Sequence, residues 1–200
     1  NCEAMAMAKL NGWKEPPSDA LLLGSYVHAY FEGQEAIEKF KEEHPEIFSS
    51  RGPTKGQLKA PFQIAEAMIS TLNNDALCQF VMRGEKEVII TAELFGIPWK
   101  VKIDNYDPEN NRFSDLKTVA NIRKEIWDPK NGYVTFVEAY RYTTQMAVYA
   151  EVERLAAGRD GWLEPILVAV SKEDPPDKAV IGFKAYDIER ELEEIRYNLP

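Results

Sequence analysis

The fold is decided by residues 99–118, WKVKIDNYDPENNRFSDLKT. The first part of this stretch alternates apolar and polar residues as far as Asp104, which is typical of a β-strand with one buried face. A turn-rich segment, 105–111, follows, and the chain then returns through Asp-Leu-Lys at 115–117. The pattern therefore predicts a strand, a turn and a second strand.

The charged side chains of this hairpin are expected to meet at one point. Side chains two residues apart in a strand share a face, so Asp115 and Lys117 point the same way while Leu116 points into the core. If Asp104 lies across the hairpin on that face, two carboxylates and one ammonium group converge. Two carboxylates repel each other unless a cation lies between them, and hard oxygen ligands suit Mg²⁺ or Mn²⁺. Asp-x-Lys alone is also common on solvated edge strands, but the whole hairpin indicates a metal-dependent phosphodiesterase site.

An apolar helix upstream adds a histidine and a glutamate. It is predicted over 18–43, with Ser18 as its N-cap. His28 and Glu32 are four residues apart on one face, and polar groups in an apolar helix cost free energy unless they have partners. Gly24 lies on the face of His28 and weakens the helix by about 1 kcal/mol relative to alanine, as expected where another backbone comes close. The alternative role of His28 is that of a hydrogen-bonded core residue.

A helix predicted over 134–157 carries polar groups on a core-facing stripe. Gln145 and Tyr149 are four residues apart and therefore share a face. An amide on an apolar stripe needs a hydrogen-bond partner. That partner is either a group of the functional site or, as the alternative, a neighbouring backbone group.

Together these features resemble the PD-(D/E)XK nuclease superfamily and, within it, the phage-type RecE-like and RecB-like exonucleases. The resemblance covers residues 20–150. Its motifs stand in the family's order: Gly24-x-x-x-His28, Glu87, Asp104, Asp115-Leu116-Lys117 and Gln145-x-x-x-Tyr149. The sequence departs from the pattern in one respect, because Ile103 stands before Asp104 where the family name has proline.

The resemblance implies a bound Mg²⁺ or Mn²⁺. Its ligands would be two side chains and one main-chain carbonyl, those of Asp104, Asp115 and Leu116. His28 would complete this site or hold a second metal. Glu87 is the preferred motif acid because of its spacing to Asp104, and Glu93, near the end of the same predicted strand, is the alternative.

The resemblance also implies roles for residues around the metal. Lys117 would position the attacking water and so act as a catalytic residue beside Asp104, Asp115 and Glu87. DNA binding or support of the site is expected from Gln145, Tyr149, Glu32 and Arg141.

The implied activity is hydrolysis of phosphodiester bonds by a DNA exonuclease, with 5′ to 3′ polarity, in phage-type recombination or repair. Linear duplex ends would be the substrate, a single-strand annealing protein would be a partner, and the protein would be a homo-oligomer. Two alternatives of the same fold stay open. One is a catalytically inactive DNA-binding or assembly module, and the other is a CRISPR-associated RecB-like nuclease. A metal-binding structural protein is a third alternative.

Composition limits the class of protein. Two hundred residues fit a single nuclease domain, and the helical patterns at both ends leave truncation open. The formal net charge of −9 argues against nonspecific DNA coating but not against a local basic groove. We found no long apolar run or signal pattern, and Cys2 and Cys78 do not form a disulfide framework, so a cytoplasmic location without membrane contact is expected.

The predicted fold class is α/β, with a mixed central sheet flanked by helices and a restriction-endonuclease-like core. The continuously apolar strand over 163–171 follows a helix, which predicts a buried central strand reached by a crossover. In the loop over 119–133, Trp127 and Tyr133 are expected either to stack on bases or to pack. The remaining predicted elements are helices 2–10, 56–73, 75–82 and 188–196 and strands 86–94, 97–105, 111–118 and 179–187.

Overall fold

The computed structural model describes residues 3–13 and 18–199, so the predicted helical position of Cys2 lies outside the described residues. Five strands form one sheet in the order β1-β2-β3-β6-β7. Strands β3 and β6 are parallel, and the other neighbours are antiparallel. The sheet is therefore mixed, as predicted. The strand bounds are β1 Glu85–Leu94, β2 Ile97–Asp107, β3 Arg112–Val119, β6 Glu164–Ser171 and β7 Lys178–Gly182.

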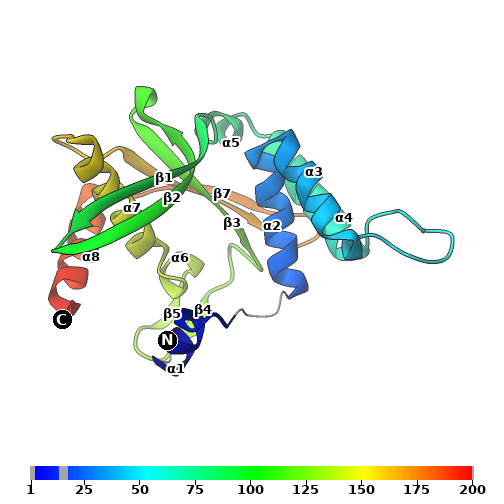
Figure 1. Cartoon of the computed structure of the whole chain (residues 1–200), viewed down its shortest axis with the longest axis horizontal. Helices are drawn as coiled ribbons and strands as arrows, with labels where there is room; N and C mark the ends of the chain where they lie inside the picture. Colours follow the sequence, from blue (N-terminus) through cyan, green and yellow to red (C-terminus); the bar gives the residue numbers. More distant parts are fainter. Residues whose placement is uncertain (1–2, 14–17, 200) are drawn as a thin grey trace.

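Helices cover both faces of this sheet (Figure 1). Apolar residues of α2, α4 and α5 pack with Leu116 and the β6 side chains in one core, whereas α7 and α8 pack on β2 in a second core. Among the described residues, no helix is both long and apolar enough to cross a membrane. The helix bounds are α1 Glu3–Leu10, α2 Asp19–Glu32, α3 Gln34–Glu43, α4 Ala60–Asn73, α5 Ala76–Val81, α6 Phe136–Ala139, α7 Tyr142–Ala157 and α8 Ala185–Asn198, with short 3-10 helices at Pro45–Ile47 and Pro108–Asn110.

The predicted helix over 18–43 is two helices. Ser18 caps α2 by accepting a hydrogen bond from the main-chain N–H of Leu21 at 3.2 Å, as expected. The helix ends at Gly33, whose φ of 147° is readily available only to glycine. The chain turns there and starts α3, so a single long helix was wrong.

The predicted helix over 134–157 is also interrupted. Thr135 begins α6 with a capping box to Glu138, and Arg141 then adopts the left-handed region at φ 58° before α7 begins. Residue 141 is not glycine, so composition alone did not indicate this break. Smaller differences from prediction are found elsewhere. Helix α4 starts at Ala60, β7 ends at Gly182, and α8 starts at Ala185. The predicted loop after β3 contains most of a hairpin, β4 Ile126–Asp128 with β5 Gly132–Val134.

Candidate active site

The site forms where β2 and β3 stop pairing. Their ladder runs from Asp107↔Arg112 to Asn105↔Ser114, and the next pair in this register would join Asp104 to Asp115. Instead, Oδ2 of Asp104 accepts a hydrogen bond from the main-chain N–H of Leu116 at 2.8 Å. A side chain thus replaces the neighbouring strand as acceptor, and the two strands separate at the predicted motif residues.

Asp115 is the most buried acid of the motif, with 2% of its surface exposed. Its Oδ1 accepts a hydrogen bond from Gln145 Nε2 at 2.8 Å, and its Oδ2 lies 2.5 Å from the ammonium nitrogen of Lys117. Among the described residues, no donor meets Oδ2 in a hydrogen-bonding direction, so the Lys117 contact is an ion pair. Asp115 and Lys117 therefore share a face and Leu116 lies in the core, as predicted.

The ionised forms of Asp104 and Asp115 are destabilised in the folded protein. Burial raises the pKa of Asp104 to about 6, against the opposing effect of the hydrogen bond from Leu116. Burial and the nearby Asp104 raise the pKa of Asp115 to about 6 as well. Because desolvation and like charge both disfavour the ionised forms, a cation between the carboxylates would stabilise them.

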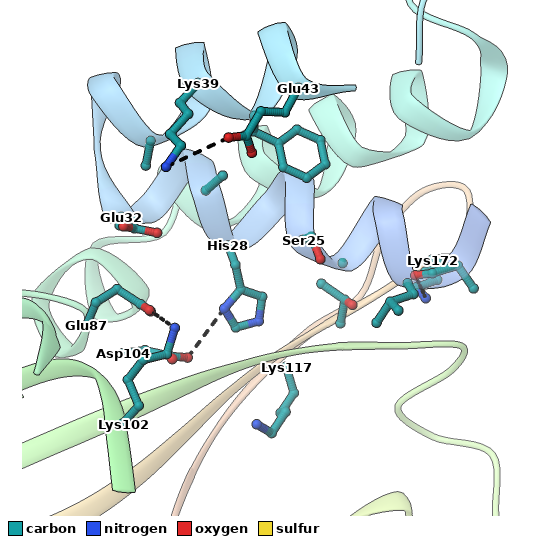
Figure 2. Close-up of a pocket in the computed structure, with 17 residues that line it drawn as sticks. Ser25, His28, Glu32, Lys39, Glu43, Glu87, Lys102, Asp104, Lys117 and Lys172 are labelled. Atoms are coloured by element: carbon teal, nitrogen blue, oxygen red, sulfur yellow. Dashed lines mark hydrogen bonds and ion pairs between the residues drawn. The ribbon is translucent and has the colours of Figure 1, made fainter. Parts of the chain in front are cut away.

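His28 approaches this pair from α2. Its Nδ1 lies 3.5 Å from Oδ2 of Asp104. Figure 2 marks this contact with a dashed line. Burial lowers the pKa of His28, so the ring is neutral near pH 7 and can offer a lone pair. A Cβ on Gly24 would lie 3.0 Å from Oγ1 of Thr118, so glycine is what allows α2 to come this close to β3. The close neighbour is a side chain, not the backbone that was predicted.

Glu87 lies opposite Asp104 in the β1–β2 register, between the pairs Lys86↔Asn105 and Val88↔Ile103. Its φ of 56° is unusual for a residue within a strand. Lys86 hydrogen-bonds Asn105, whereas Glu87 faces the cleft and pairs there with Lys102 (Figure 2). Strained backbone of this kind is found mainly at functional sites.

Glu93, the alternative motif acid, lies at the far end of the same strand. It pairs with Pro98 close to the hairpin turn and is exposed. Glu87 lines the cleft and Glu93 does not. The placement therefore favours Glu87.

A cleft of about 700 Å³ lies between α2, α3 and the strands. Asp104 and His28 face it, and Glu32 lines its edge, as Figure 2 shows. Four lysines also line it, in a chain whose net charge is −9. They are Lys39, Lys102, Lys117 and Lys172. Four acids line the same cleft, and two of them pair with lysines, Glu43 with Lys39 and Glu87 with Lys102. In the described part of the chain, Lys117 and Lys172 have no such pair with a cleft acid, so they are the cations best placed for a phosphodiester substrate.

The predicted supporting residues are placed unequally. Gln145 holds Asp115, and Tyr149 is half-buried on the same helix, with its ring centroid 6.5 Å from that of Phe113. Arg141 lies apart from the cleft, where Nη1 is 3.8 Å from Oε1 of Glu194. Among the described residues, the side chain of Arg141 pairs with Glu194, and neither Asp104 nor Asp115 is its partner.

Tyr142 was given no role from the sequence. Its ring centroid lies 5.3 Å from the Lys117 ammonium nitrogen, within cation–π range. Burial, followed by the charge of Asp115, raises the pKa of Tyr142 to about 12. Tyr142 lies three residues before Gln145 and therefore on the same helical face. This spacing in the sequence could have predicted that Tyr142 belongs to the site.

The chemistry of these residues fits a divalent metal. Within residues 3–13 and 18–199, no three His, Cys, Asp or Glu side chains are placed closely enough to hold a metal ion as they stand. The raised pKa values of both aspartates and the neutral His28 ring are nevertheless features that a bound cation would stabilise. The ligands would be Asp104, Asp115 and His28, with the carbonyl of Leu116.

Comparison with known proteins agrees with this geometry. Residues 1–200 match the family model described as "PDDEXK-like domain of unknown function (DUF3799)". The chain therefore belongs to the PDDEXK-like family, as the order of its motifs predicted.

One solved structure is similar over almost the whole chain. A crystal structure of a "Putative exonuclease" from Eubacterium rectale is 38% identical, covers 98% of this chain and 71% of that one, and has a TM-score of 0.89. A crystal structure of SSO0001 is 14% identical with a TM-score of 0.31, too low to inform fold or function. Among curated proteins, none matches the chain. The family and the first structure confirm the predicted fold and support a nuclease, a class that generally uses divalent metal ions.

Proposed function

We propose that the protein is a Mg²⁺- or Mn²⁺-dependent deoxyribonuclease that removes nucleotides from the ends of linear DNA. The observation that carries this proposal is the meeting of Asp104, Asp115 and Lys117 where β2 and β3 separate. Here the ladder is interrupted where buried Asp115 and partly buried Asp104 lie beside a lysine at a cleft.

Each residue of the proposed site has a separate role in this proposal. When bound, the divalent ion would act as a Lewis acid on the phosphate and would lower the pKa of the water molecule that attacks it. Lys117 directs its ammonium group at the attacking water and offsets charge that develops on the phosphate. Gln145 fixes the orientation of Asp115 through its 2.8 Å hydrogen bond, and Tyr142 limits the movement of Lys117 from the other side. The cleft lysines Lys39, Lys102 and Lys172 hold the DNA backbone.

Exonuclease action is proposed because the 38% identical structure is that of a "Putative exonuclease". From the motif resemblance we further propose that residues 1–200 form a single nuclease domain. The same resemblance is the basis for proposing 5′ to 3′ polarity, homo-oligomers and a cytoplasmic role in phage-type recombination or repair, together with a single-strand annealing protein.

The test is digestion of end-labelled linear duplex with Mn²⁺, beside a covalently closed circle of the same sequence. Mononucleotide release from the linear DNA, with the circle intact, is expected. Blocking either the 5′ or the 3′ end reports polarity. Cleavage of the circle would move the assignment to an endonuclease such as a CRISPR-associated RecB-like enzyme, and absence of any cleavage with DNA binding intact would leave an inactive binding module.

A further inference from the structure

A small aromatic hairpin, β4–β5, lies in the segment that follows β3. In β4–β5, Trp127 pairs with Tyr133, and their ring centroids are 5.2 Å apart in an edge-to-face arrangement. Their exposed fractions are 62% and 69%. Large aromatic side chains exposed together indicate a surface that a ligand covers.

The rings border a cavity rather than a flat patch. Its volume is about 470 Å³, within the usual range for small-ligand pockets. Tyr140, exposed at 53%, forms another wall. Lys124 and Glu125 also line the cavity, which gives it a cation for a phosphate and an acceptor for a base N–H.

The hairpin is held in shape by its own turns. Oδ1 of Asp128 accepts hydrogen bonds from the main-chain N–H groups of Lys130 at 2.9 Å and Asn131 at 2.7 Å. At its base, Oδ1 of Asn121 accepts from the N–H groups of Arg123 and Lys124. A preorganised surface loses little conformational entropy when a ligand binds.

Aromatic rings connect this cavity to Lys117. The centroids of Tyr140 and Tyr142 are 5.8 Å apart, and Tyr142 lies 5.3 Å from the ammonium nitrogen of Lys117. The rings of Tyr140 and Tyr142 therefore lead from the cavity to Lys117 in two steps. Polymer substrates bind in this way, with one unit at the reacting centre and the next in an adjoining pocket.

We propose that the β4–β5 hairpin and Tyr140 form a pocket for an unpaired nucleobase of the DNA strand, next to the phosphate that is cut. This proposal rests on the proposed function and deepens it. Every base has a π-face, so stacking on Trp127 and Tyr133 holds a strand end without regard to its sequence. The pocket would keep the end of the strand separated from its complement while Lys124 contacts the adjoining phosphate.

Binding of a fluorescein-labelled duplex with a short single-stranded end tests the proposal, using the Asp104→Asn protein with Mg²⁺ so that the DNA stays intact. Trp127→Ala and Tyr133→Ala are each expected to weaken binding by about 10-fold, the effect of losing one stacked base. Trp127→Phe restores most of the affinity. Tyr186→Ala is the matched control, because Tyr186 on α8 is exposed at 69%, as Tyr133 is, and does not line this cavity.

Abasic sites identify the contact. An abasic residue at the end of the strand is expected to weaken binding to the protein that keeps Trp127. The loss should be about as large as the loss that Trp127→Ala causes with intact DNA. Combining the abasic residue with Trp127→Ala should cause little further loss. Additive losses would overturn the proposal, as would unchanged binding and cleavage in folded Trp127→Ala. Conversion of an oligomer to a monomer by Trp127→Ala, seen by light scattering, would assign the patch to a second copy instead. If the wild-type protein, with both Trp127 and Asp104, neither binds nor cuts DNA, the proposed function itself fails.

Discussion

The carboxylate of Asp104 on β2 accepts a hydrogen bond from the main-chain N–H of Leu116 on β3, at 2.8 Å. Leu116 stands between Asp115 and Lys117, so this one bond ties the two halves of the motif together. It also satisfies an N–H group that the separated strand no longer pairs. The divergence of the strands and the assembly of the site are therefore the same structural event.

Asp104→Asn separates the charge of this residue from its hydrogen bond. The amide oxygen can still accept from Leu116, but a neutral group binds a divalent cation poorly. Cleavage is expected to fall by on the order of 10³-fold, as when a group that stabilises transition-state charge is lost. Metal-free stability should stay the same or rise, because a buried charge with a raised pKa is removed. End-labelled DNA and thermal unfolding measure the two effects.

Asp107→Asn provides the matched control on the same strand. Asp107 is buried and pairs with Arg112 at 2.6 Å, away from the cleft. Removing one partner of a buried ion pair costs about 3 kcal/mol or more. We expect this variant to lose stability and keep activity at temperatures where it is folded. The reverse pattern in the two variants would mean that Asp104 is structural.

The residue types and their order predicted much of the site because the site uses regular geometry. Strand alternation correctly placed Asp115 and Lys117 together and Leu116 in the core. Helical spacing brought His28 to Asp104, since one turn separates it from the glycine that permits close packing. These rules are local, so a single sequence contains them.

The features that were missed depend on backbone that leaves the regular regions. The left-handed conformation of Arg141 separates α6 from α7, and Glu87 adopts a φ of 56° within β1 beside the cleft. Neither residue is glycine, so tertiary packing and not local preference sets these angles. Hairpin β4–β5 was missed because its strands contain only three residues each, too few to show alternation.

The pH dependence of metal-free stability follows from the raised pKa values of Asp104 and Asp115. Both are about 6 in the folded protein, against about 4 in an unfolded chain. Between these values the folded state binds more protons, so the pair favours folding below pH 4 and this contribution is lost as the pH rises through 6. We expect each carboxylate to lower stability by roughly 2 kcal/mol between pH 4 and pH 7, and the pair together by about 4 kcal/mol.

Denaturant unfolding of the wild type and Asp104→Asn at pH 4.5 and pH 7.5 measures this effect, in the presence of a chelator. The two proteins should be closer in stability at pH 4.5, and the variant should be the more stable at pH 7.5. Added Mn²⁺ should stabilise the wild type more at pH 7.5, because both carboxylates are then ionised. An equal difference at both pH values would contradict a buried, protonating pair.

His28→Ala tests whether this residue holds metal or only fills the core. If Nδ1 is a ligand, its loss weakens the metal site, and the activity deficit should be about 10-fold or more at low Mn²⁺ and smaller at saturating Mn²⁺. His28→Gln is the control, since its amide can still reach Asp104 but is a poor metal ligand. A deficit that is the same at every Mn²⁺ concentration, or full activity in His28→Gln, would restore the role of a hydrogen-bonded core histidine.

Gly24→Ala tests whether the approach of α2 to β3 sets the activity. Alanine favours the helix by about 1 kcal/mol, but its Cβ would lie 3.0 Å from Oγ1 of Thr118, on the strand that carries Lys117. The helix must shift outward or Thr118 must turn, and His28 moves with the helix away from Asp104. We expect activity to fall by about 10-fold, since displacements near 1 Å can cost more than this.

The double variant Gly24→Ala/Thr118→Ala removes the opposing oxygen and decides between the two effects. Activity should return to near the level of Thr118→Ala alone, while thermal unfolding keeps the gain from alanine, about 2–4 °C for a chain of this size. Full activity in Gly24→Ala would show that the close contact is dispensable. Loss that persists in the double variant would mean that the glycine is needed for some purpose other than room for Thr118.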